Sequence, residues 1–137
     1  MNKIIFALAS LIVLSSCSSD LFRESSEPAS NNNAVVALVN SAHTDAAANK
    51  FDAAGATLER ALRIEPRNPA LWQELARVRL QQGEYQQVES LAAKSNGLAG
   101  DNKSMRAENW RLIGQARLKR GDHQGAQAAF NKAAETN

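Results

Sequence analysis

Few side chains in this sequence are of the types that catalyse reactions or bind metals. The 137 residues include two histidines, His43 and His123, and a single cysteine, Cys17. The histidines lie far apart, and neither has a spacing typical of a metal-ligand pair. No nucleophile elbow, phosphate-binding loop or paired-carboxylate pattern occurs. We therefore predict a protein that is not an enzyme and that uses no metal, cofactor or small-molecule substrate.

Cys17 is the residue whose surroundings do indicate chemistry. It follows Lys3, an apolar run from Ile4 to Leu14 and two small residues, as in an export signal. The apolar run is too short for a membrane span, which needs about 20 residues. We therefore expect residues 1–16 to be a cleaved signal peptide. A lone thiol in an exported protein closes no internal disulfide, so it is expected to be modified; the alternative is an unmodified cysteine behind an ordinary signal.

The string Leu14-Ser15-Ser16-Cys17 resembles the lipobox of bacterial lipoproteins. The resemblance implies that a diacylglyceryl group alkylates the Cys17 thiol and that the peptide bond before Cys17 is cut. It also implies that the new amino terminus is acylated, and palmitate is the expected acyl group. Several acyl chains anchor a protein stably, since each buried methylene contributes roughly 0.8 kcal/mol. Ser18 stands where Asp commonly signals retention in the inner membrane. The resemblance therefore implies lipid anchoring in the cell outer membrane, facing the periplasm.

The segment after the cysteine looks like a linker. Residues 17–34 are rich in Ser, Asn and Glu and show no apolar periodicity, so we predict a flexible tether. Leu21 and Phe22 are the apolar exceptions in this segment. Two alternatives are open for these side chains: they rest on the lipid surface, or they pack on the domain. Residues 35–137 are predicted to be one domain. The net charge of +2 includes Lys3, and the sequence has no long basic run, so nucleic acid is not an expected partner.

The domain contains an internal duplication. Residues 71–88 align without gaps with residues 109–126, 38 positions later. The alignment pairs Trp72 with Trp110, Leu75 with Ile113, Ala76 with Gly114, Arg79 with Arg117, Leu80 with Leu118, and Gly83 with Gly121. A further unit lies 34 residues before the first, so unit starts are expected near Val35, Pro69 and Ala107.

This pattern resembles the tetratricopeptide repeat, with a bulky residue, Leu and a small residue in a first helix, a Gly turn, and an aromatic and alanines in a second. In the first unit the same frame gives Ala42, Phe51, Ala54, Leu58 and Ala61. The resemblance implies an all-α fold, a short right-handed α-solenoid of three helical hairpins. The sequence departs from the family at Ser41, Asp45, Arg79 and Arg117. The longer second interval predicts four extra residues in the loop around residues 98–104.

Local signals agree with helical hairpins. Leu71, Trp72, Leu75, Ala76 and Val78 recur at the spacing of a buried helix face. Other residues mark helix ends. Asn68 and Pro69 indicate the start of a helix, and Gly83 and Gly121 indicate the ends of first helices. Asp122 is expected to cap the last helix. His123 takes the position of Phe51 and Tyr85, so we expect it to pack rather than to react. Each hairpin is expected to bury its apolar face by stacking on the next.

In tetratricopeptide repeats the first helices line a concave groove that binds peptides. The resemblance carries this role to residues out of phase with the packing stripe. The candidate partner-binding residues are Val39, His43, Gln73, Arg77, Leu80, Arg111, Gln115 and Leu118. Their mixture of apolar, amide and guanidinium groups suits an extended segment of another protein, because Arg pairs with carboxylates and Leu buries apolar side chains. The alternative is a solvated face on which Glu74 and Glu108 pair with the arginines.

Two functions fit these features. The first is an outer-membrane-anchored periplasmic adaptor or scaffold that binds an envelope protein, similar in kind to tetratricopeptide lipoproteins that assist pilus assembly, outer-membrane protein insertion or cell-wall enzymes. The second is a permanent structural subunit of an envelope complex. An adaptor is expected to be monomeric without its lipid, whereas an obligate subunit is expected to aggregate or oligomerise without its partners.

Overall fold

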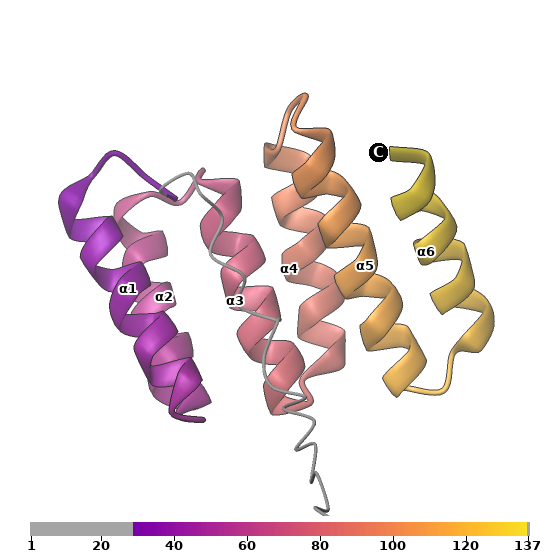
Figure 1. The fold of residues 1–137 in the computed structure, drawn as a ribbon, viewed down its shortest axis with the longest axis horizontal. Coiled ribbons are helices and arrows are strands. Elements are labelled where there is room, and N and C mark those ends of the chain that lie inside the picture. The colour runs from indigo at the N-terminus through magenta and orange to yellow at the C-terminus, as the bar shows by residue number, and fades with distance from the viewer. Residues whose placement is uncertain (1–28, 137) are drawn as a thin grey trace, which may run out of the picture.

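A computed structural model of the chain describes residues 29–136, and over this range every regular element is an α-helix. The predicted signal peptide, Cys17 and most of the predicted tether lie outside the described residues. The helices are α1 (Asn33–Ala47), α2 (Phe51–Ile64), α3 (Pro69–Gln82), α4 (Tyr85–Leu98), α5 (Lys103–Lys119) and α6 (His123–Thr136). They form three antiparallel hairpins stacked in sequence order, as Figure 1 shows. The predicted all-α solenoid of three hairpins is confirmed.

The helix ends follow from residues that satisfy or interrupt the backbone hydrogen-bond pattern. The Asn68 side chain accepts a hydrogen bond from the backbone N–H of Ala70 (3.0 Å), and Pro69 opens α3. Gly83 ends α3 with φ of 79°, a left-handed conformation that glycine adopts without steric cost. Asp122 caps the last helix by accepting from the N–H of Gly125 (2.8 Å). These predicted ends are confirmed.

The domain begins earlier than the predicted boundary between residues 34 and 35. Helix α1 starts at Asn33, and Asn68 Nδ2 donates to the carbonyl oxygen of Ala29 (2.6 Å). Ser30 Oγ donates to Glu65 Oε1 (2.6 Å). The polar residues 29–34 therefore belong to the folded domain, because contacts with the α2–α3 loop order them.

The four extra residues of the last repeat lie in a helix and not in the predicted loop. Four residues separate α4 from α5, as between α2 and α3, whereas α5 begins at Lys103 and not near Ala107. Asn102 caps the added turn by accepting from the N–H of Met105 (2.9 Å). The helix extends because Ala107 has a backbone N–H, whereas its counterpart Pro69 has none and disfavours helix before it.

The core consists of two apolar clusters, one on each side of α3. Leu58, Leu71 and Val35 are among the largest fully buried side chains of the cluster in the first hairpins, and Leu112 and Val88 lie in the other cluster. Alanines and Gly114 allow close approach of the helices. A Cβ added at Gly114 would lie 2.5 Å from the Phe130 ring, so α6 packs directly on the α5 backbone.

Arg79 and Arg117, which stand where the family usually has an aromatic residue, bridge successive hairpins. Arg79 Nη2 lies 2.6 Å from Glu59 Oε1 of α2, and Arg117 Nε lies 2.9 Å from Glu89 Oε2 of α4. The positional prediction for His123 is wrong, because its side chain is exposed while Phe51 and Tyr85 are half-buried. Within residues 29–136 no further hairpin follows α6 against which this position would pack.

Candidate functional site

The candidate site is the surface that the first helices of the hairpins present, here called the first-helix face. It carries the predicted residues on α1, α3 and α5, and α3 and α5 contact each other directly. The structure places the predicted residues in three settings: Val39 and Gln73 in the interior, His43, Arg77 and Arg111 in a charged row, and Leu80, Gln115 and Leu118 around a surface hollow.

Val39 and Gln73 do not face a ligand, which corrects the sequence-based assignment. Val39 is 6% exposed and belongs to the apolar core, and Gln73 is 7% exposed at the α3–α5 contact. Helix α3 packs against α2, α4 and α5, so its buried arc is wider than the single stripe assumed from the sequence. Neither residue is available for direct contact with a partner.

Gln73 instead joins a buried polar network. Gln73 Nε2 donates to Asn109 Oδ1 (2.9 Å), and Asn109 Nδ2 donates to Ser95 Oγ (2.8 Å) and to Asn96 Oδ1 (2.9 Å). Ser95 Oγ donates in turn to the carbonyl oxygen of Pro69 (2.9 Å). Because Asn109 and Ser95 are fully buried, these bonds fix the register of α5 against α3 and α4.

A row of alternating charges crosses the first-helix face. His43 Nε2 lies 3.2 Å from Glu74 Oε2, and Arg77 Nη2 lies 3.5 Å from Glu108 Oε1. Arg111 Nη1 lies 3.1 Å from the other oxygen of Glu108. One carboxylate thus serves two guanidinium groups, which is the pairing considered as the alternative to a binding role. The Arg77 side chain is 14% exposed and that of Arg111 is 43% exposed, so Arg111 is the more accessible.

A hollow of about 400 Å³ adjoins the charged row between the C-terminal ends of α3 and α5. Leu80, Gln115 and Leu118 line it, and the Leu118 side chain stands 47% exposed. The structure therefore brings Leu80 of α3 together with Gln115 and Leu118 of α5, which are predicted residues of two different repeats. The hollow offers apolar surface with an amide at its edge, one helical turn from Arg111.

Sequence reasoning missed other contributors to this surface. Tyr85, Gln81 and Lys119 also line the hollow, and Tyr85 reaches it from the first turn of α4. Asn109 stands at the position that Leu71 occupies in the preceding repeat. An amide in the position of a core leucine is itself a signal, because a buried amide requires hydrogen-bond partners from neighbouring helices.

Metal-ligand clusters and membrane-spanning helices are both missing from the described residues. Among them no cluster of three or more His, Cys, Asp or Glu side chains is arranged to hold a metal ion. No helix in residues 29–136 is both long and apolar enough to span a bilayer. The site consists of two guanidinium groups that pair with one carboxylate, beside an apolar hollow.

Comparisons with known proteins agree with the hairpin architecture. A family model described as tetratricopeptide repeat matches residues 45–107. The chain is similar to the solved globular C-terminal domain of P. aeruginosa LpoP, with 38% identity and a TM-score of 0.74 over 77% of this chain and 99% of that one. It also resembles the Sgt2 TPR domain from Aspergillus fumigatus, with 21% identity and a TM-score of 0.69 over 82% of this chain and 72% of that one.

The second likeness shows the fold alone, since the identity is low. No curated protein sequence matches the chain significantly. The LpoP domain, by contrast, is covered almost completely at 38% identity. Together with the family model and the three observed hairpins, this shows that the chain belongs to the tetratricopeptide-repeat family, as does the bacterial LpoP domain that it resembles.

Proposed function

We propose that this protein is a non-catalytic adaptor, anchored in the outer membrane by lipid on Cys17, that binds a segment of another envelope protein on the first-helix face. The observation that carries the proposal is the hollow lined by Leu80, Gln115 and Leu118 beside the Arg77–Glu108–Arg111 cluster. An exposed leucine next to guanidinium groups provides both an apolar contact and a polar anchor for a segment of another protein.

The charged cluster allows exchange with a ligand carboxylate. Exposed ion pairs are worth about 0 to 1 kcal/mol, so displacing Glu108 from Arg111 costs little. A carboxylate from a partner that pairs with Arg111 through two parallel N–H···O bonds makes a stronger contact in a partly dry groove. The site therefore suits an acidic or amide-rich segment that also carries an apolar side chain for the hollow.

The anchoring part of the proposal rests on the lipobox-like string ending at Cys17 and on Ser18 after it. The related LpoP domain is described as C-terminal in its own protein, an order that agrees with a repeat domain behind an amino-terminal anchor. In this arrangement residues 18–28 connect the lipid to the domain, and the first-helix face is presented to periplasmic proteins.

The test removes the two guanidinium groups while preserving their packing. We replace Arg77→Met and Arg111→Met together, since Met keeps an apolar stem where Arg77 is largely buried. The matched control replaces Arg60→Met and Arg63→Met on α2, both exposed and away from the first-helix face. Partners are crosslinked in intact envelopes, captured on the full chain and quantified by mass spectrometry.

The proposal predicts that the face variant captures at least tenfold less of a discrete envelope protein than the parent, while the α2 control captures a parent-like amount. Both variants are expected to retain helical circular dichroism and a melting temperature near that of the parent. Equal capture by the face variant and the control would reject the first-helix face as the binding surface.

A further inference from the structure

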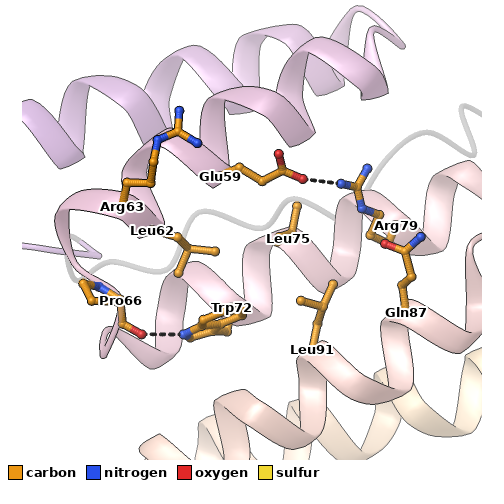
Figure 2. Close-up of a pocket in the computed structure, with 9 residues that line it drawn as sticks. All are labelled: Glu59, Leu62, Arg63, Pro66, Trp72, Leu75, Arg79, Gln87 and Leu91. Atoms are coloured by element: carbon orange, nitrogen blue, oxygen red, sulfur yellow. Dashed lines mark hydrogen bonds and ion pairs between the residues drawn. The ribbon is translucent and has the colours of Figure 1, made fainter.

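A second apolar groove lies on the opposite side of α3, between α2 and α4. Figure 2 shows Leu62, Leu75 and Leu91 pointing into one space, with Trp72 and Pro66 at one end. This space, here called the second-helix groove, has a volume of about 380 Å³. Leu62 and Leu75 form its buried floor, whereas Trp72 and Leu91 are half-buried. Its size suits a few apolar side chains.

The amino-terminal segment enters the domain beside this groove. The backbone of Ala29 is held by Asn68, and Ser30 is held by Glu65, both in the loop between α2 and α3. Pro66 of the same loop lines the groove and accepts a hydrogen bond from Trp72 Nε1 (2.9 Å). Ala29, the first described residue, is therefore held by the loop that forms the Trp72 end of the groove.

We propose that Leu21 and Phe22 of the same chain dock in the second-helix groove. They are the large apolar residues of the segment 18–28, which is otherwise polar or charged. Phe22 lies seven positions before Ala29, and this stretch of chain spans at most about 25 Å when extended. The part of α3 that lines the groove, from Trp72 to Arg79, is about 10 Å long. Leu21 and Phe22 can therefore reach any part of the groove.

Charge favours the same occupant. Residues 18–28 contain three acidic side chains and one basic side chain, a net charge of −2. The exposed cations near the groove are Arg63 on its rim, Arg67 in the entry loop and Lys94, whose Nζ lies 6.0 Å from the Trp72 ring centroid. The acidic residue that lines the groove, Glu59, is paired with Arg79 (2.6 Å). No ion pair within residues 29–136 joins Arg63, Arg67 or Lys94 to an acidic side chain. An acidic segment complements this border.

Docking within one chain needs little intrinsic affinity, because a short linker gives an effective concentration in the millimolar range. It would shorten the connection between Cys17 and the domain and orient the domain relative to the anchor. The inference is independent of the proposed partner site, which lies on the first-helix face and stays open when the second-helix groove is filled.

The experiment uses residues 18–137, which lack the only cysteine of the chain. The globular C-terminal domain of LpoP, of which this chain covers 99%, was itself solved as a domain, so the repeat unit is expected to fold without its leader. A nitroxide is attached to Ser19→Cys, and the indole N–H signals of Trp72 and Trp110 are compared by NMR. Trp110 is the internal control, since it makes the same kind of contact in the last hairpin: Lys132 Nζ lies 4.5 Å from its ring centroid, as Lys94 Nζ lies over the ring of Trp72.

Docking predicts strong broadening of the Trp72 signal and little of the Trp110 signal. The double change Leu21→Ser and Phe22→Ser is expected to restore the Trp72 signal. Arg63→Glu on the groove rim is expected to reduce the broadening, whereas Arg60→Glu, equally exposed on α2 but outside the groove, is expected to leave it unchanged.

Three outcomes would overturn the proposal. Equal or absent broadening at the two tryptophans would show that the segment does not dock in this groove. Loss of broadening on tenfold dilution would assign the groove to a second copy of the chain. Loss on adding phosphatidylethanolamine–phosphatidylglycerol vesicles would show that the apolar pair rests on lipid instead; persistence under both conditions supports docking.

Discussion

Replacing Asn109→Ala tests the network that holds the last repeat in register. Asn109 accepts one hydrogen bond from Gln73 and donates to Ser95 and Asn96, with all three distances between 2.8 and 2.9 Å. Each such bond contributes about 0.5 to 1.5 kcal/mol net, so their loss costs roughly 3 kcal/mol. Gln73 Nε2 then keeps its hydrogen bond to the Met105 carbonyl oxygen (3.3 Å), and Gln73 Oε1 keeps its contact with Arg77 Nη2 (3.5 Å). For a domain of this size we expect a melting temperature about 12 °C lower.

The assay is urea unfolding followed by far-UV circular dichroism, with the slope of the transition reported alongside its midpoint. Asn131→Ala is the matched control, because Asn131 lies in α6 and its bond from Gln127 is exposed. A second arm replaces Gln73→Leu and Asn109→Leu together; removing both partners is expected to recover part of the loss of the single Asn109→Leu change. If Asn109→Ala unfolds within about 0.5 kcal/mol of the control, the network does not stabilise the fold as argued.

Three further outcomes follow from the same account. Truncating Trp72 or Trp110 to Ala is expected to lower the free energy of unfolding by about 3 kcal/mol, since both are half-buried; parent-like urea midpoints would contradict the repeat packing. Changing Cys17→Ser is expected to abolish membrane fractionation and processing before residue 17; mass spectrometry that finds a membrane-bound parent without lipid on Cys17 would refute anchoring. Changing Leu118→Ser is expected to weaken partner capture with a melting temperature within a few degrees of the parent; unchanged capture would exclude the hollow.

Most of the helical architecture was predictable because its signals are local. Asn68 and Pro69 start a helix through capping and a missing backbone donor, and Gly83 ends it through its left-handed φ. The repeated Trp72 and Trp110 set the spacing of the hairpins. None of these features depends on a distant contact, so periodicity and end signals were sufficient.

The features that sequence reasoning missed depend on contacts between distant residues. Residues 29–34 have no apolar period, and Ala29 and Ser30 are ordered by hydrogen bonds to Asn68 and Glu65. Gln73 occupies a groove position of the repeat pattern, yet α5 places Met105 of its added turn and Asn109 against it. The sequence pattern of α3 alone does not show that α5 covers this face of the helix.

The candidate site was predicted in part. The phase of the first helices identified Leu80, Gln115 and Leu118, which meet at one hollow although Leu80 comes from the second repeat and the other two from the third. The sequence also showed that Glu108 lies near the arginines, but not that one carboxylate bridges Arg77 and Arg111. That arrangement depends on the spacing of α3 and α5, which the buried Gln73–Asn109 bond sets.

The most direct test of the adaptor function places a photo-crosslinking amino acid at Gln115 in the full chain, in living cells. Gln115 is exposed and lines the hollow, and Gln127 is an equally exposed glutamine on α6 that serves as the control position. Illumination is expected to give a discrete adduct with one envelope protein from position 115 and none from position 127. No adduct from position 115, or the same adducts from both positions, would contradict binding on the first-helix face.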